Sequence, residues 1–417
     1  MISTSTAIRT AVSSLGILLS VHPSGPGIIP LRGQTGPENP AGEAQEGSAP
    51  VWSVASTPEV SIGAEDGPDP YILFNVVDAA ILSDGTIVVV SYSRNHFDLR
   101  FYDPDGEFLT SAGRFGQGPF EVSSAISTLG RLPGDSLMVV SLDRRFSVFG
   151  PKGDFGRSGR LDLPPGMFPS HLLSDSHMIL WSSRMGKAGG PNQPTPGEFL
   201  LSIVELDSGA TETLGPFPSG RTLLGERGLF LHLPFEPEIH WAAGGGQCWL
   251  GNSGENEVRA FLPDGSSSLT IDLKRPAVSI DREARERWKE FDLTGTKGDR
   301  RRAFQAHHRR VRFPETFPVF HDLHVDTDGN LWVLRFEPPW STADYFWDVF
   351  DSRGANVASV VAEFSVLGPE MRSRSYHDLG PIKEIGADYI IVQRRSDLGV
   401  ITIRKHRLER AAEAGSH

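Results

Sequence analysis

The chain has 417 residues, a formal net charge of −12 at pH 7, and one cysteine beside 45 glycines and 31 prolines. An acidic chain gains nothing from counterion release at phosphates, so its charge disfavours nucleic acid as a partner. The single cysteine, Cys248, excludes an intrachain disulfide. It lies in the apolar run 248–250, which predicts a buried, inert thiol.

Residues 1–50 precede the first strand-like pattern. Residues 11–21 are mildly apolar and follow Arg9, a pattern typical of a weak secretory signal, although no clean small-residue cleavage site follows. The segment is too short and too polar to span a bilayer, so we expect no transmembrane segment. Residues 22–50 are rich in Gly, Pro, Glu and Ser, which indicates a disordered linker. The pattern predicts a secreted or periplasmic protein, and a disordered tail is the alternative.

A strand-and-turn unit then recurs along the chain. Its clearest copy spans residues 79–109 and contains Asp-Gly turns at 84–85 and 105–106, and a related copy spans residues 323–354. Asp-Gly supplies the positive backbone angles that tight hairpins require. Self-similarity at this spacing is typical of a β-propeller.

The unit predicts an all-β fold, a six-bladed β-propeller of four-stranded antiparallel blades within residues 51–410. Residues 411–417 would form a disordered tail. The blades are expected at about residues 75–113, 122–161, 170–215, 238–273, 323–354 and 376–408. Apolar runs such as 87–90 predict strands buried on both faces. A β-sandwich is the alternative, which the number of comparable units disfavours.

A ring must hide the edge of its last blade, because an open edge invites aggregation. The strand-like residues 51–62 are therefore predicted to pair into the sixth blade. Residues 184–197 are rich in Gly and Pro and are predicted to form a loop. Trp249 and Trp332 lie inside strand patterns and are predicted to be core residues rather than a ligand platform.

Residues 279–312 are predicted to form a helical insertion between blades 4 and 5, over one mouth of the ring. Asp281 and Asp299 would cap its two helices. The buried face of the first helix is expected to hold Ala284, Trp288 and Phe291. The insertion is rich in arginine, and a solvated helix face is favoured over a site for an anionic ligand.

The strand unit at residues 84–90, followed by Asp-Pro-Asp-Gly at 103–106, resembles an NHL repeat, and His96 lies where that repeat carries its Asn-His signature. Further segments resemble a family of bacterial, mostly uncharacterised, six-bladed β-propeller proteins, and these are residues 113–121, 317–333 and 394–400. The resemblance covers residues 51–408 and implies the propeller fold. The wider superfold hosts lactonases, amidating lyases and binding modules, so it implies no single activity.

Propeller enzymes carry their functional groups where the innermost strands start, and this chain has polar residues at those positions. The candidate ligand-binding residues are His171, Glu238, His240, Asp322 and His377. The position of His321 resembles that of a ligand in amidating-lyase and lactonase propellers. A divalent cation, calcium or zinc, is therefore predicted as one alternative, on His321, Glu238 and His377. In the other alternative these side chains are polar plugs that hydrogen-bond one another.

Two function classes stay open. The first is a secreted or periplasmic propeller that binds a small molecule or a protein through one mouth of its channel, without catalysis. The second is a metal-dependent hydrolase or lyase, lactonase-like or amidating-lyase-like. The residues identify no ligand and leave open whether the protein is an enzyme.

Overall fold

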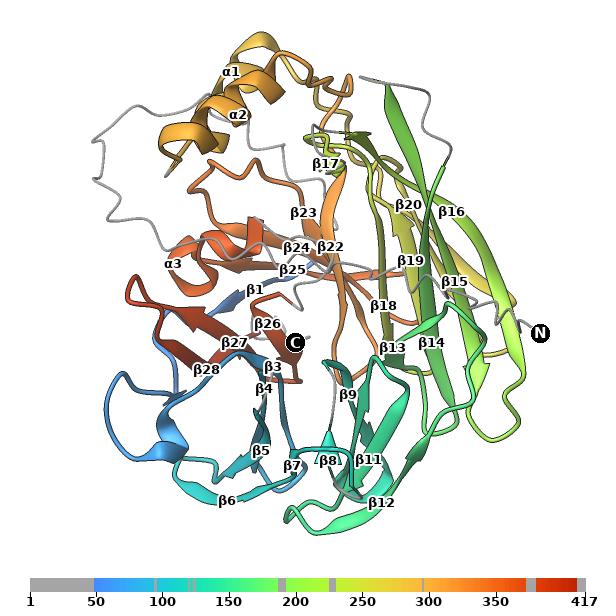
Figure 1. The fold of residues 1–417 in the computed structure, drawn as a ribbon, viewed down its shortest axis with the longest axis vertical. Coiled ribbons are helices and arrows are strands. Elements are labelled where there is room, and N and C mark those ends of the chain that lie inside the picture. The colour runs from blue at the N-terminus through green and yellow to red at the C-terminus, as the bar shows by residue number, and fades with distance from the viewer. Residues whose placement is uncertain are drawn as a thin grey trace, which may run out of the picture.

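The computed structural model describes residues 49–93, 96–118, 121–122, 125–186, 193–224, 230–294, 296–372 and 380–410. The predicted signal-like segment, His377 and residues 411–417 lie outside this part of the chain. The described residues are mostly β, in antiparallel sheets placed around a common centre (Figure 1). This arrangement is consistent with a β-propeller.

Three of the sheets have four strands, and each begins with its strand nearest the centre. The first contains β3 (Val76–Ile81), β4 (Ile87–Ser93), β5 (His96–Tyr102) and β6 (Phe108–Ala112). The second contains β9 (Ile126–Leu132), β10 (Ser136–Ser141), β11 (Arg145–Phe149) and β12 (Phe155–Arg160). The third contains β18 (Ile239–Gly244), β19 (Gln247–Asn252), β20 (Glu257–Phe261) and β21 (Ser267–Asp272). A short parallel pair, β7 (Arg114–Phe115) and β8 (Glu121–Val122), joins the first two along the chain.

The third sheet along the chain has five strands, where a blade of four was predicted. It contains β13 (Phe168–Leu172), β14 (His177–Met185), β15 (Pro194–Glu205), β16 (Thr211–Leu224) and β17 (Phe230–His232). Residues 184–197 were expected to be a loop, yet β14 and β15 continue into both ends and pair Met185 with Gly197. The loop prediction is wrong at these ends, because cross-strand pairing there outweighs the turn tendency of Gly and Pro.

The remaining sheet has nine strands and brings the two ends of the described chain together. Its strands are β22 (Phe320–Val325), β23 (Leu331–Arg335), β24 (Tyr345–Phe350), β25 (Asn356–Ala362), β26 (Ile382–Ile385), β27 (Tyr389–Arg395), β28 (Ile401–Glu409), β1 (Val51–Val54) and β2 (Val60–Ile62). Strands β1 and β2 both pair antiparallel with β28, which confirms that residues 51–62 pair with the last strand. Strand β1 also pairs in parallel with β25, which was not predicted.

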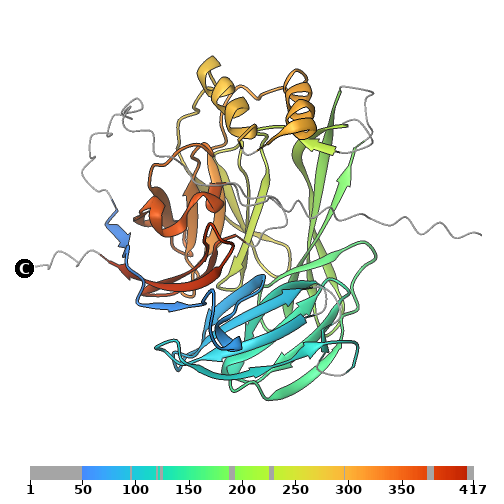
Figure 2. The same ribbon diagram turned by 60° about the vertical axis from the view of Figure 1, so that its left-hand side comes forward.

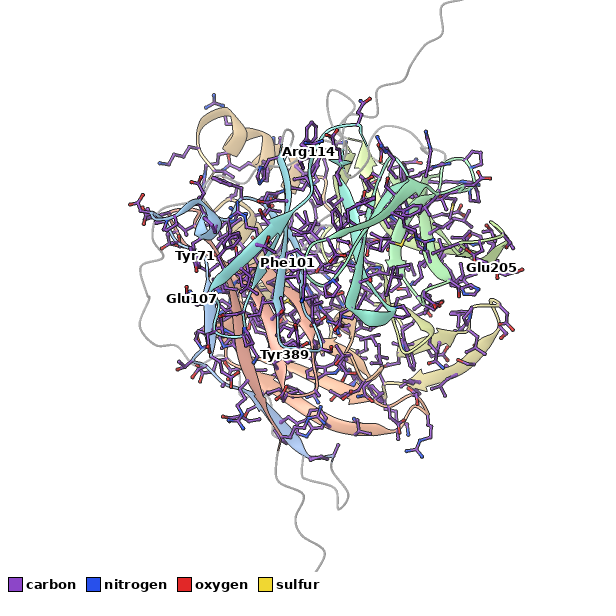
Figure 3. All side chains as sticks on the ribbon, turned by 90° about the horizontal axis from the view of Figure 1, so that it is seen from below. Tyr71, Phe101, Glu107, Arg114, Glu205 and Tyr389 are labelled. Carbon is purple, nitrogen blue, oxygen red and sulfur yellow. The ribbon has the colours of Figure 1, made fainter. Side chains whose placement is uncertain are left out.

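After β2, the chain is fastened to the first sheet. The Tyr71 hydroxyl donates to Glu107 Oε2 at 3.0 Å (Figure 3). The Arg100 guanidinium donates to the carbonyls of Asp69, Pro70 and Ile72 at 2.8–3.0 Å. These bonds hold the connection between β2, which belongs to the last sheet, and β3 against β5 of the first sheet and the turn after it.

The Asp-Gly repeat has a physical cause. The Asp103 carboxylate accepts the N–H groups of Asp105 and Glu107 at 3.0 and 2.8 Å, while Gly106 takes a φ of 88°. In the related copy, Asp326 accepts the N–H groups two and four residues on in the first turn, and Asp351 does so in the second turn. The carboxylate satisfies backbone donors that the turn exposes, and glycine provides the left-handed angle.

The core confirms the predictions made for single residues. Val88, Val89 and Val90 are fully buried, as are Trp249 and Trp332. Cys248 is also buried, and burial raises the pKa of its thiol to about 12. A thiol in that state is protonated at neutral pH and inert as a nucleophile.

Helices α1 (Arg282–Asp292) and α2 (Gly298–His308) lie between β21 and β22, at the edge of the molecule (Figure 2). Asp281 caps α1 by accepting the Ala284 N–H at 2.8 Å. The predicted Asp299 cap is wrong, because α2 begins at Gly298 and Asp299 is inside it. Phe291, expected on the buried face, is 38% exposed. Trp288, which was expected on the same face, packs on His308 and Phe313 inside the hairpin.

The shorter helical segments are α3 (Phe364–Leu367), η1 (Asp69–Tyr71), η2 (Pro133–Asp135) and η4 (Pro369–Arg372). Helices α1, α2 and α3 all lie in connections that lead into the first strand of a sheet. Within the described ranges, no helix combines the length and the apolar character that a membrane crossing requires.

Candidate functional site

Six strands surround the common centre (Figure 1), and we call them the first strands: β3, β9, β13, β18, β22 and β26. Neighbouring contacts join β3 to β9, β9 to β13, β13 to β18, β18 to β22, and β26 to β3. The Thr327 N–H donates to the Ile385 carbonyl at 2.9 Å and links the ends of β22 and β26. Polar side chains that point inward from these strands therefore lie close to one another near the common centre.

Register shifts typical of β-bulges occur where five of these strands, β3, β9, β13, β22 and β26, pair with the next strand. In β3, β22 and β26 the residue after the shift is acidic, and the three are Asp78, Asp322 and Glu384. The Asp78 and Asp322 carboxylates accept the N–H of the next residue at 2.9 and 3.0 Å. A bulge re-aims the following side chain, so the same local device turns a carboxylate toward a neighbouring first strand three times.

On one side of the common centre, Asp322 lies between two histidines. Its Oδ1 is 3.5 Å from His240 Nδ1, and its Oδ2 is 3.6 Å from His324 Nε2. Burial lowers the pKa of His324 to about 4, with the charge of His240 acting in the same direction. In the part of the chain that the structure describes, no group of three or more His, Cys, Asp and Glu is arranged to hold a metal ion.

On the other side, Glu384 joins three first strands. It accepts the Ile81 N–H at 2.8 Å and an Arg131 Nη2–H at 2.8 Å, and it also accepts the Tyr389 hydroxyl. Burial raises the pKa of Glu384, while Arg131 and these hydrogen bonds oppose the rise. The cluster ties β26 to β3 and β9, so it joins the last and the first of these strands near the common centre.

Asp78 lies beside this cluster, surrounded by protein atoms apart from a small solvent contact. Burial raises the pKa of its carboxyl to about 7, although the Lys383 charge lowers it. Lys383 donates to the Val77 carbonyl at 3.1 Å, which keeps the ammonium close to Asp78. A buried carboxyl whose pKa is raised toward neutrality is a frequent mark of a functional site.

The strands β13 and β18 are joined by a third polar contact. Trp241 Nε1 donates to Ser170 Oγ at 3.0 Å, and that oxygen is 2.7 Å from His171 Nδ1. We call these residues on the first strands the polar belt, which consists of Asp78, Ser170, His171, His240, Asp322, His324, Lys383 and Glu384. Because the members of each cluster contact one another, the belt ties neighbouring first strands together.

A cleft of about 330 Å³ opens beside the starts of β18 and β22. It is lined by Pro218, Ser219, Arg221, Glu236, Pro237, Asn252 and Pro314. Arg221 Nε and Nη2 donate to the Glu236 carboxylate at 2.8 and 2.6 Å. The Glu236 side chain is buried, whereas that of Arg221 is 45% exposed. We call this the mouth cleft; it presents a guanidinium held by a buried carboxylate.

A group of half-buried aromatic rings is centred on Phe235, the residue before Glu236 of the mouth cleft. The Phe235 ring lies 4.9–6.2 Å, centroid to centroid, from four rings, namely Phe313, Phe317, Phe336 and Trp340. Phe235 has a φ of 59°, an unfavourable angle for a residue with a side chain. His321 lies 6.0 Å from Phe336. We call the five rings the aromatic cluster; Phe235 and Phe313 adjoin the cleft residues Glu236 and Pro314 in sequence, and Phe336 contacts His321.

The predicted site residues fall into two places. His171, His240 and Asp322 belong to the polar belt, and Asp322 and His240 are in direct proximity. His321 lies against the aromatic cluster. The Glu238 N–H donates to Ser253 Oγ at 2.9 Å, next to Asn252 of the mouth cleft. His377 is outside the described residues.

The sequence reasoning missed several functional candidates. Asp78 precedes the Asp-Gly turn at 84–85 by six residues, and Asp322 precedes the turn at 328–329 by six residues. That shared spacing was a usable signal for Asp78. Arg221, Glu236 and the aromatic cluster come from separate connections without a repeat, so no pattern in the sequence marks them.

Asp78 and His324 should have opposite effects on stability between pH 4 and 6.5. The folded-state pKa of Asp78 is raised, so its contribution is complete below pH 3.8 and is lost as pH rises through about 7. The folded-state pKa of His324 is lowered, so its contribution is present above pH 6.5 and is lost as pH falls through about 4. The two trends cancel in part in the wild type.

The free energy of unfolding of Asp78→Asn, taken relative to that of the wild type, should therefore increase by about 2–3 kcal/mol as the pH is raised from 5 to 8, since one pKa unit is about 1.4 kcal/mol. His324→Gln should show the reverse trend, gaining relative stability from pH 6.5 down to pH 4. Urea unfolding at matched pH values measures both differences. A difference that does not change with pH for either variant would contradict the assigned pKa directions.

No family model matches the chain, and no curated protein matches its sequence. Several solved structures resemble the path of this chain over most of its length. A putative exported protein from Bacteroides fragilis is 8% identical, with 87% of this chain and 96% of that chain covered and a TM-score of 0.43. A member of the DUF4221 family from Bacteroides vulgatus is 9% identical, with 86% and 98% covered and a TM-score of 0.46. The calcium-binding protein regucalcin from Agrobacterium tumefaciens is 13% identical, with 88% and 98% covered and a TM-score of 0.35. Likeness at this level assigns no function.

Proposed function

We propose that this chain is an exported, six-bladed β-propeller with NHL-like repeats over residues 51–410, and that it binds a small organic ligand at the mouth cleft. The observation that carries the proposal is the cleft itself, in which an exposed guanidinium is fixed by a buried carboxylate beside half-buried rings. Concave sites that combine apolar walls with a few oriented polar groups are the usual form of ligand pockets. Export is supported by the signal-like pattern of residues 1–21.

The lining residues restrict the ligand. Arg221 and Asn252 supply N–H donors, Ser219 supplies a hydroxyl, and three prolines supply apolar contact. Because Glu236 already compensates the Arg221 charge, the cleft favours a neutral molecule with hydrogen-bond acceptors over a strong anion. The aromatic cluster adds an apolar border, so a ligand with one flat apolar face fits this side.

The test compares two arginine–glutamate pairs. Arg221→Lys keeps the charge beside Glu236 but removes the two-pronged contact that orients the guanidinium. We expect ligands found by screening a fragment library against the wild type to bind this variant about tenfold more weakly, a loss of about 1.4 kcal/mol. Calorimetric titration of each hit measures the change.

Arg259→Lys is the matched control. Arg259 pairs with Glu257 at 3.1 Å and is 52% exposed, close to the exposure of Arg221, but it lies on β20 away from the cleft. Hits should bind this variant as they bind the wild type. Equal affinity for the wild type and Arg221→Lys, or a library that yields no hit, would count against the mouth cleft as the binding site.

A metal-dependent hydrolase or lyase is the second candidate. It is favoured by the proximity of His240 and Asp322 in the channel, next to His321 in the chain. The cation, calcium or zinc, would then be held by His321, Glu238 and His377 and would polarise a carbonyl or activate water. Elemental analysis of the purified wild type and of His321→Ala separates this candidate from the binding module. A stoichiometric cation that His321→Ala loses would favour the enzyme.

A further inference from the structure

The helical hairpin carries a concentration of positive charge that contrasts with the rest of the molecule. Residues 297–312 contain seven lysine and arginine residues and one acidic residue, in a chain with a net charge of −12. Among the side chains that the structure describes, the exposed arginines on and after α2 are Arg301, Arg302, Arg309 and Arg312. We call these four residues the basic face.

Apolar side chains are exposed on the same insertion. Phe291, in the last turn of α1, is 38% exposed, and Val278, in the connection before α1, is 57% exposed. The Arg301 Nη1–H donates to the Leu293 carbonyl at 3.2 Å, so this guanidinium lies at the end of α1, two residues beyond Phe291. The insertion therefore combines cationic and apolar groups at one edge of the protein (Figures 1 and 2).

Other residues hold the hairpin together. Trp288 packs on His308 and Phe313 at centroid distances of 5.1 and 5.5 Å. His308 Nε2 lies 2.6 Å from Asp292 Oδ2 and joins α2 to α1. Because this interior is aromatic and ion-paired, changes to the exposed arginines should leave the hairpin folded.

We propose that the basic face docks the protein on a bilayer surface that contains anionic lipids. The negative surface potential of such a bilayer attracts guanidinium groups, and each group contributes about 1 kcal/mol to binding near the surface. Phe291 and Val278 add apolar groups that can enter the headgroup boundary. A soluble polyanion would use the arginines alone and gain nothing from these two side chains. This proposal does not depend on the ligand of the mouth cleft.

The experiment uses the full chain and sedimentation with vesicles. Vesicles of neutral phosphatidylcholine are compared with vesicles that contain phosphatidylglycerol, at low and at physiological salt. The triple variant Arg301→Gln, Arg302→Gln, Arg309→Gln should bind the anionic vesicles roughly 100-fold more weakly, from about 1 kcal/mol for each arginine. Phe291→Ser should weaken binding several-fold while leaving the response to salt unchanged.

The matched control removes the same charge elsewhere. Lys152→Gln, Arg157→Gln, Arg160→Gln changes exposed residues in the β11–β12 hairpin and should retain binding. Circular dichroism of every variant establishes that it is folded. Equal binding of the two triple variants, or no preference for anionic over neutral vesicles, would overturn the proposal. Binding to heparin without binding to anionic vesicles would overturn it in favour of a soluble polyanion.

Discussion

Replacing Trp52 with alanine should lower the free energy of unfolding by about 3–5 kcal/mol, the range for truncating a buried tryptophan. The Trp52 ring lies 6.3 Å from that of Trp332, in the core of the nine-stranded sheet, and the Arg410 guanidinium lies 4.5 Å from its centroid. Its strand, β1, pairs with both β25 and β28. The substitution therefore weakens the only β-pairing that joins these two strands within the described residues, in addition to leaving a cavity.

Val51→Ala in the same strand provides the control for this effect. Val51 is 61% exposed, so its truncation should change stability by less than about 0.5 kcal/mol. Chemical denaturation of the wild type and both variants gives the comparison. If the two substitutions cost the same, β1 does not anchor the ring through its buried side chain.

Arg275→Leu should cost about 3 kcal/mol or more, because it breaks a buried ion pair. The side chains of Arg275 and Asp348 are 13% and 12% exposed, and they form a direct hydrogen bond. Burial alone would raise the pKa of Asp348. The hydrogen bond from Arg335 and the charges of both arginines outweigh burial and lower the pKa below its usual value, so the carboxylate is ionised. Without Arg275, this charge keeps the Arg335 contact at 2.6 Å and a long hydrogen bond from the Ser359 hydroxyl at 3.4 Å.

Arg275 also positions the candidate site. Its Nη1–H donates to the Val319 carbonyl at 3.0 Å, directly before Phe320 begins β22. Losing this bond should loosen the start of the strand that carries His321 and Asp322. We therefore expect Arg275→Leu to lower ligand affinity as well as stability.

Arg353→Leu is the surface counterpart. Arg353 pairs with Asp351 at 2.9 Å, but it is 86% exposed. An exposed pair of this kind contributes about 0–1 kcal/mol, so the substitution should be nearly neutral. Thermal and urea unfolding of both variants tests the contrast. Equal losses would show that burial does not decide the strength of these pairs.

The regular part of the fold was predictable because it repeats. Asp103 and Asp326 satisfy the same backbone donors, so their turns recur with the same residues. The pairing of residues 51–62 with the last strand followed from the need to cover an edge. The parallel pairing of β1 with β25 could not be predicted, since short strands carry no information about a second partner. The Phe291 error arose because helical spacing identifies a face but does not show which neighbour covers it.

The site was predictable only where it follows the repeat. Asp322 and His240 were found because they lie at the start of first strands, and Asp78 could have been found by the same spacing. Lys383 and Glu384 were missed because β26 starts at Ile382, later than the expected start of the sixth blade. Arg221 and Phe235 depend on how separate connections meet over one mouth. That is a tertiary property with no periodic pattern in the sequence.

Hydrogen–deuterium exchange with a bound ligand tests the central claim most directly, because it locates the site without any substitution. The strongest hit from the library should slow exchange in residues 218–222, 235–240 and 250–254, which surround the mouth cleft. Exchange in the turns at 84–86, 244–247 and 327–330, where first strands end, should stay unchanged. Protection confined to those turns, or spread over the outer strands, would contradict binding at the mouth cleft.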